Sequence, residues 1–425
     1  MNFFLRIILL IILLICYKEI PVFEPRGVNY IISILCLSII GFEIKKLWNS
    51  ISLDESRKIK IQKIAYLTLI ILIIFSVILI MHKEYPASKI RFIRGILILV
   101  SLTIGGKLVG IISKTQIKNQ IKNTILFTFS AVSFIAIIEI IFMFISLSHG
   151  SGEAYSGKIW GNKYWNPINK LGFRDEEPKK GKNTVFFVGD SFTAGWGVKK
   201  IEDRFGETMA SELKKKGITI NEINLGRYGA DTRLEFHVFK NFIDKSEIKP
   251  DHLVLQFFVN DMDKFISTSD RCSQKENTIS SWKKHLIDGS YLINYLHSIY
   301  PSASTKLLPK ECDYLENLKI AYKTDSIWSK EVKQLDKFKL YCTQNKISLT
   351  MVFFPFMEDL NLAKKLNIEK RIKNYCTSNQ INFINVTSYI KNLSRQKRQV
   401  SIVDSHASAE VHKIVGKVLS EKIKI

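Results

Sequence analysis

A serine with the surroundings of a nucleophile stands in Val188-Gly189-Asp190-Ser191, directly after a short apolar run. In a glycine-flanked turn between a strand and a helix, a serine exposes its hydroxyl and the backbone N–H groups point at its ligand. The hydroxyl attacks a carbonyl only when a base removes its proton, and neutral imidazole is the suitable base near pH 7. His406 fits this role, and Asp404 can orient its ring. These residue types favour acyl transfer through an acyl-serine.

Two further polar groups follow short apolar runs. Gly229 lies in the loop after the second run, and Asn260 follows the third. The tetrahedral intermediate of acyl transfer carries an oxyanion that needs hydrogen-bond donors. The backbone N–H groups of Ser191 and Gly229 and the side-chain amide of Asn260 are the predicted donors. Asp190 and Asp261 are interpreted as groups that brace these loops without reacting.

Each of these residues also has a plainer interpretation. Ser191 could only cap a helix, Gly229 could only permit a turn, and Asn260 could only brace a loop. His406 could be a surface residue, which is how His412 in the last predicted helix is interpreted. The order of the four stretches along the chain favours the catalytic interpretation.

The elements that would position these groups alternate between strand and helix. The predicted strands are Thr184–Gly189, Thr219–Leu225, Leu253–Val259, Leu349–Phe354 and Asn382–Val386. The predicted helices are Glu202–Lys215, Thr232–Ile243, Trp328–Thr343, Asn361–Thr377 and Ala407–Lys422. Buried runs of this length between helices indicate a parallel sheet covered on both faces. Ligands bind beyond the carboxyl ends of such strands, where all the candidate residues fall.

The four stretches resemble the SGNH (GDSL-type) hydrolase family, whose Ser, Gly, Asn and His are met here in order at Ser191, Gly229, Asn260 and His406. The resemblance implies an α/β fold, a three-layer α/β/α sandwich with a flavodoxin-like, five-stranded parallel sheet. It also implies an esterase that uses no cofactor. The segment 169–175 is similar to one found in membrane-attached bacterial members. Two positions depart from the family pattern: Phe258 replaces a glycine, and Asp404 precedes the histidine by two residues, not three.

The first 150 residues read as apolar runs separated by short polar links. The candidate membrane spans are Phe3–Tyr17, Val28–Phe42, Ile64–Met81, Gly95–Ser113 and Thr124–Leu147. About five transmembrane helices are predicted, with four as the alternative. With five spans, the basic residues in the links place the C-terminal part outside the cytoplasm. Glu139 lies deep in the last span, where it either has a function or joins helices.

The remaining composition narrows the class of protein. The net charge of +23 is spread as single lysines without aromatic residues between them, so no nucleic-acid partner is predicted. No cysteine or histidine pair has metal-ligand spacing, so no metal is predicted. Outside the cytoplasm, one or two disulfides among four cysteines are as plausible as free thiols. These are Cys272, Cys312, Cys342 and Cys376.

Together these patterns predict a transmembrane region over residues 1–148, a lead-in segment over 149–183, and a hydrolase domain over 184–425 with an insertion at about 262–325. The predicted function is hydrolysis or transfer of acyl esters, chiefly acetyl esters, on envelope or secreted glycans. Envelope polysaccharide machinery is the predicted partner. The alternative is a non-catalytic glycan-binding or assembly module whose function resides in the membrane spans.

Overall fold

The computed structural model describes residues 119–149, 154–265, 287–299 and 314–425, with isolated positions between residues 95 and 110. The chain divides into two compact units, residues 1–72 and residues 73–425. All described residues belong to the second unit.

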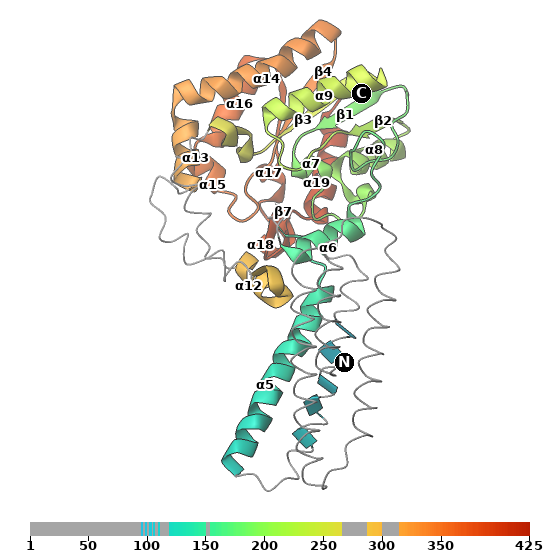
Figure 1. Ribbon diagram of the computed structural model, residues 1–425. Helices are drawn as coiled ribbons and strands as arrows, with labels where there is room; N and C mark the ends of the chain where they lie inside the picture. Colours follow the sequence, from blue (N-terminus) through green and yellow to red (C-terminus); the bar gives the residue numbers. More distant parts are fainter. Residues whose placement is uncertain are drawn as a thin grey trace, which may run out of the picture. The chain divides into compact units, whose positions relative to one another are not determined.

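A parallel sheet forms the centre of the polar part of the chain. Its strands are β1 (Thr184–Val188), β2 (Asn221–Asn224), β3 (His252–Phe257), β4 (Ser348–Phe353) and β5 (Asn382–Asn385). They lie in the order β2-β1-β3-β4-β5, which is the flavodoxin-like order (Figure 1). The predicted five-stranded parallel sheet is therefore confirmed. Each strand also lies within two residues of its predicted bounds.

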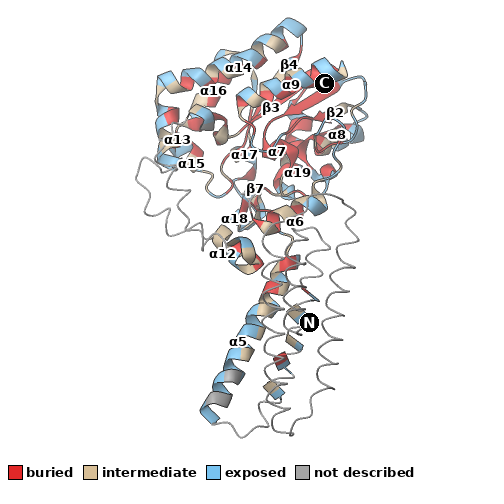
Figure 2. Cartoon of the chain, viewed as in Figure 1, coloured by how far each residue is buried: buried red, intermediate tan, exposed pale blue. Residues whose placement is uncertain are grey.

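Helices cover both faces of this sheet, whose strands β1 and β3 are fully buried while the edge strands β2 and β5 are only partly buried (Figure 2). On one face Phe186 of β1 packs edge-on against Phe239 and Phe242 of α9 (Thr232–Ser246). On the other face Phe187 packs against Phe205 of α8 (Phe205–Lys215). Successive strand residues point to opposite faces, so one apolar run supplies two cores. Helices α14 (Asp325–Asn345) and α16 (Ile368–Ser378) join the first core, and α19 (Ala409–Lys422) joins the second.

The other described elements are short, apart from the long helix α5. They are α5 (Asn119–Phe144), α6 (Tyr155–Tyr164), α7 (Ser191–Ala194), η1 (Ile201–Asp203), η2 (Val259–Phe265), α12 (Tyr291–Ile299), α13 (Tyr314–Lys323), α15 (Leu362–Lys365), α17 (Thr387–Ile390), β6 (Gln399–Ser401), α18 (Arg395–Arg398) and β7 (Asp404–Ala407). The predicted helix Asn361–Thr377 is two helices, α15 and α16. It breaks at Asn367, whose backbone has a φ of 66°. This left-handed conformation ends a helix, and asparagine adopts it more readily than most residues.

The predicted insertion at 262–325 is described only in part, because residues 266–286 and 300–313 lie outside the described residues. Its last helix, α13, belongs to the core: Leu318, Ala321 and Tyr322 are buried there. The hydroxyl of Tyr322 also donates to the carbonyl of Val259 in η2. The end of this stretch therefore packs as part of the domain.

Helix α5 is the one apolar helix among the described residues that is long enough to cross a membrane. The segment Leu126–Phe144 has a mean hydropathy of 2.3, and 11% of it is buried within the chain. An apolar helix left so open is typical of a membrane span. The other predicted spans lie outside the described residues, except that isolated positions of Gly95–Ser113 are helical.

Candidate functional site

The turn after β1 presents Ser191 at the first position of the short helix α7. The carboxylate of Asp190 caps this helix by accepting a hydrogen bond from the backbone N–H of Phe192, at 2.8 Å. A Cβ atom at Gly189 would collide with the side chains of Thr193 and Gln256, so the position before Asp190 has room only for glycine. In Gly-Asp-Ser, the glycine thus permits close packing, the aspartate caps the helix and the serine begins it.

His406 and Asp404 reach this serine from the hairpin β6–β7. The Nε2 atom of His406 lies 2.8 Å from Ser191 Oγ, and its Nδ1 atom lies 2.6 Å from Asp404 Oδ1. Residues two apart on a strand point to the same side, which explains how the two-residue spacing brings both side chains to Ser191. The structure therefore brings together the three residues predicted as nucleophile, base and orienting acid.

Asp404 is ionised in this setting. Burial alone would raise the pKa of its carboxyl, which is 1% exposed. The hydrogen bond and charge of His406, with a further hydrogen bond from Ser148, outweigh burial and hold the pKa below its ordinary value. A carboxylate so placed fixes the tautomer in which His406 Nε2 accepts the serine proton.

The predicted oxyanion donors flank the serine turn. The amide of Asn260, in η2 after β3, is within reach of the Asp190 carboxyl, and its Oδ1 atom has no hydrogen-bond partner among the described residues. Gly229 has a φ of 68°, while a Cβ atom there would meet nothing, so backbone conformation and not space favours glycine. The close approach is made by Gly226, where a Cβ atom would collide with the backbone of Ala194. Sequence reasoning misses Gly226, because nothing local marks which glycine touches the turn.

A group of buried acids lies behind this edge of the sheet. Asp261 accepts hydrogen bonds from the backbone N–H of Phe258, at 2.9 Å, and from the hydroxyl of Thr232, at 3.0 Å. The same hydroxyl lies 2.6 Å from Glu331. Burial, together with the charge of nearby acids, raises the pKa of Asp261 and Glu235 well above the ordinary values, and that of Glu331 to about 8. Burial thus disfavours the charged forms of these carboxyl groups.

The stretch 169–175, within the lead-in segment, holds the chain that follows Ser191. Arg174 is buried and donates to the carbonyls of Gly195, at 2.6 Å, and Val198, at 2.7 Å. Its guanidinium also lies over the ring of Trp165. Burial, with the nearby charge of Arg204, lowers the pKa of Arg174 to about 9. This arginine fixes the loop that leaves α7.

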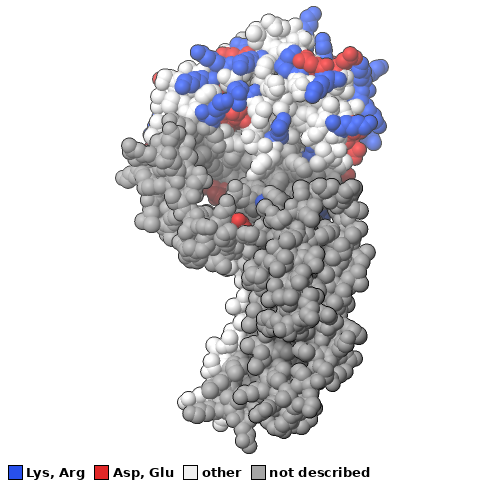
Figure 3. Space-filling view, viewed as in Figure 1, with Lys and Arg blue, Asp and Glu red and all other residues white. Residues whose placement is uncertain are grey.

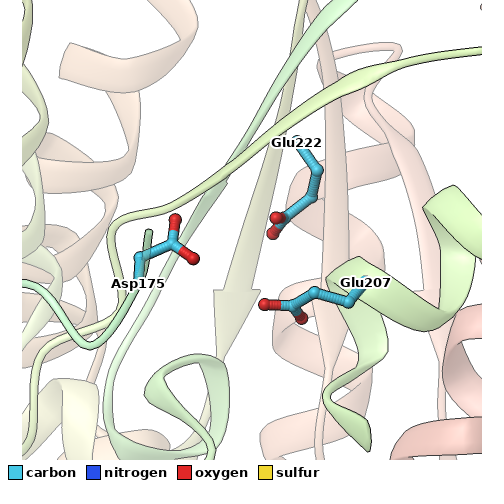
Figure 4. A group of neighbouring side chains, drawn as sticks. All are labelled: Asp175, Glu207 and Glu222. Atoms are coloured by element: carbon cyan, nitrogen blue, oxygen red, sulfur yellow. The ribbon is translucent and has the colours of Figure 1, made fainter. Parts of the chain in front are cut away.

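Three carboxylates, those of Asp175, Glu207 and Glu222, lie within 4.8 Å of one another and point toward a common centre (Figure 4). The buried guanidinium of Arg204 pairs with two of them, with Asp175 at 3.0 Å and with Glu207. Burial and the charge of Asp175 raise the pKa of Glu222 to about 8. The positive charge of Arg204 thus balances these carboxylates, and we predict no bound ligand there.

His412 was predicted to face solvent, and that prediction is wrong. Its ring is 1% exposed and stacks on Phe205, and its Nδ1 atom accepts the backbone N–H of Phe205 at 3.2 Å. Burial, with the charges of Arg204 and Arg174, lowers the pKa of His412 to about 3. Helix α19 packs closely on α8, so the face of α19 that carries His412, interpreted from the sequence as exposed, is covered.

Aromatic rings lie around His406. The rings of Trp196 and Tyr228 lie 4.9 Å apart, and their centroids are 6.4 and 6.5 Å from that of His406. Phe192 packs on Phe258, the residue that replaces the family glycine, at 4.7 Å. Tyr228 is 41% exposed, so this edge offers an aromatic face to a ligand.

Two of the four cysteines considered for disulfides are described. Cys342 and Cys376 are free and buried, and burial raises the pKa of both thiols to about 12. They are inert packing residues. Cys272 and Cys312 lie outside the described residues.

Comparison with known proteins gives one family and a set of distant structures. The profile of the GDSL-like Lipase/Acylhydrolase family matches residues 185–417. No curated protein matches the chain. Similar solved structures include a G-D-S-L family lipolytic protein from Veillonella parvula (13% identity, 56% of this chain and 96% of that chain, TM-score 0.33). Another is an acetylxylan esterase from Geobacillus stearothermophilus (12% identity, 58% and 96% coverage, TM-score 0.35). With more than half of its length matched by the family profile, the chain belongs to the GDSL-like lipase/acylhydrolase family and is an ester-bond hydrolase.

Proposed function

We propose that this protein is a membrane-anchored serine esterase or O-acyltransferase in which Ser191, His406 and Asp404 form the catalytic triad. One observation carries the proposal: an unbroken hydrogen-bonded series runs from Ser191 Oγ through both ring nitrogens of His406 to Asp404. Ser191 Oγ bonds to the acyl carbon as His406 Nε2 takes its proton. The ester C–O bond then breaks, and the alcohol leaves with that proton. Water or a sugar hydroxyl releases the acyl group by the reverse sequence.

The oxyanion that forms in these steps is stabilised by the backbone N–H groups of Ser191 and Gly229 and by the amide of Asn260. Such donors act strongly because they are fixed before the reaction and shielded from water. Asp190 supports them: its carboxyl caps α7 and lies within reach of the Asn260 amide. Asp261 supports the loop that carries Asn260 through its bond to the backbone of Phe258.

The proposed substrates are acyl esters, chiefly acetyl esters, of envelope or secreted glycans. The exposed ring of Tyr228 beside Trp196 suits the flat apolar face of a sugar. Phe258 packs on Phe192, the residue after Ser191, where the family pattern has a glycine, and this added bulk suits a short acyl chain. Lys and Arg side chains are scattered among acids over the face in Figure 3, and the net charge of +23 suits an anionic envelope. Helix α5 would anchor the domain on the extracytoplasmic side of the membrane.

Labelling of the full chain in detergent by a fluorophosphonate tests the triad. The probe forms an O–P bond with an activated serine and loses fluoride. We expect labelling and hydrolysis of an aryl acetate by the wild-type chain, loss of both in Ser191→Ala, and retention of both in Ser388→Ala, which removes an exposed serine from α17. A folded wild-type chain that neither labels nor turns over would contradict the proposal and favour a non-catalytic glycan-binding module.

A further inference from the structure

The segment that follows the apolar helix α5 contacts the catalytic acid. Ser148 lies four residues after Phe144, the last residue of α5. Ser148 is buried, with 3% of its surface exposed. Its hydroxyl donates a hydrogen bond to Asp404 Oδ2, which lies 256 residues away in the sequence. The next carbonyl, that of His149, accepts the indole N–H of Trp196 at 3.0 Å. The segment after α5 thus contacts both Asp404, in the hairpin β6–β7, and Trp196, in the loop after α7.

The two oxygens of Asp404 have different donors. Oδ1 accepts from His406 twice, from the ring Nδ1 at 2.6 Å and from the backbone N–H at 3.1 Å. The donor to Oδ2 is Ser148. A buried carboxylate oxygen without a donor is costly, and a carboxylate held on one side only is free to turn about its Cβ–Cγ bond. Ser148 therefore fixes the plane of the carboxylate that His406 uses.

The position of Ser148 is itself set by contacts on α5. Glu139 accepts hydrogen bonds from the hydroxyl of Ser290, at 2.8 Å, and from the backbone N–H groups of Tyr291, at 2.8 Å, and Leu292, at 3.0 Å. This buried acid, whose role the sequence left open, thus caps the start of α12. Met143 packs on Tyr291 in the same cluster. Held by Glu139 before it and by His149 after it, the segment presents Ser148 in one place.

We propose that Ser148 is a positioning residue of the catalytic site, which holds Asp404 in the orientation that His406 requires. The triad would then be completed by the segment that leaves the membrane helix, and not by the hydrolase domain alone. This inference rests on the proposed serine chemistry, since it assigns Ser148 a role in activating Ser191.

The test uses the full chain in detergent or lipid nanodiscs, with two readouts: the rate constant for fluorophosphonate labelling of Ser191, and aryl acetate hydrolysis across pH. The variants are Ser148→Ala, Ser148→Thr, which keeps the hydroxyl, and Ser146→Ala. Ser146 is the matched control, because it lies two residues away and its hydroxyl has no hydrogen-bond partner among the described residues.

We expect Ser148→Ala to lower kcat and the labelling rate about 10-fold with little change in KM, the size expected for one hydrogen bond to a charged group. The acid limb of the kcat/KM profile should also move to higher pH, by about 0.5–1 unit, because an Asp404–His406 pair with one donor fewer binds a proton more readily. Asp190 and His412, which also interact with His406, are unchanged in these variants. Ser148→Thr should restore the rate and the acid limb, and Ser146→Ala should match the wild type.

Three results would overturn the inference: wild-type labelling and profile in Ser148→Ala, equal losses in Ser148→Ala and Ser146→Ala, or a loss that leaves the acid limb in place and that threonine does not restore. In each of these cases the wild-type chain is still active, so the proposed function stands while the role of Ser148 does not. Absence of labelling in the wild-type chain is a different result, which would contradict the triad and this inference with it.

Discussion

The turn that carries Ser191 and the hairpin that carries His406 meet at one site but are held in different ways. The turn is fixed by its own neighbourhood: Asp190 caps it, Gly189 gives it room, and Arg174 holds the loop that follows. The hairpin β6–β7 is short, and its Asp404 accepts a hydrogen bond from Ser148, four residues after the apolar helix α5. The contacts named for the Ser191 turn thus come from nearby in the sequence, whereas the hairpin also accepts a donor 256 residues away.

The largest effect that would sharpen this comparison is expected at Asn260. Replacement by alanine should lower kcat by about 10²–10³-fold, because one donor to the oxyanion is lost while the turn stays intact. Hydrolysis kinetics with an aryl acetate measure the effect. Asn385→Ala is the control, since Asn385 also ends a strand and braces the next turn, through the backbone N–H of Thr387. Equal activity of the two variants would remove Asn260 from the oxyanion site.

A smaller effect is expected from Arg174→Lys, which keeps a cation but loses the guanidinium fork that donates to four backbone carbonyls. We expect the free energy of unfolding to fall by about 2–3 kcal/mol, since buried carbonyls lose a charged donor. Thermal unfolding of the full chain measures this. Arg233→Lys, at an exposed position on α9, should change nothing. If both variants unfold like the wild type, the turn does not depend on its lead-in segment.

The smallest effect concerns the buried acids behind the turn. The pKa of Glu331 is raised from 4.5 to about 8, so the folded state binds a proton that the unfolded state releases. Its stabilisation is present below about pH 4.5 and is lost as pH rises through about 8. The unfolding temperature should therefore fall over this window, and less steeply in Glu331→Gln, which mimics the protonated acid. Glu421→Gln, at an exposed position on α19, should keep the wild-type slope.

Sequence alone reaches the features that are encoded locally. Runs of five to seven residues predict the strands, and the Gly-Asp-Ser turn and Asp-x-His spacing identify the residues that the structure brings together at Ser191. Contacts between distant segments are beyond such patterns. His412 has the polar type of a surface residue, and only the packing of α19 on α8 buries it. Ser148 belongs to no motif, and its partner lies 256 residues away.

That separation also orders events during synthesis. A growing chain makes α5 and the Ser191 turn before β3, β4, β5 and the hairpin exist. At ribosomal rates of roughly 5–20 residues per second, some 10–50 seconds pass between the emergence of Ser148 and that of Asp404. Once Ser191 has been made, the nascent chain carries this serine without Asp404 and His406 for the rest of that time. The hydrogen-bonded series from Ser191 to Asp404 is thus among the last features that translation permits, well after the apolar helix α5 has been made.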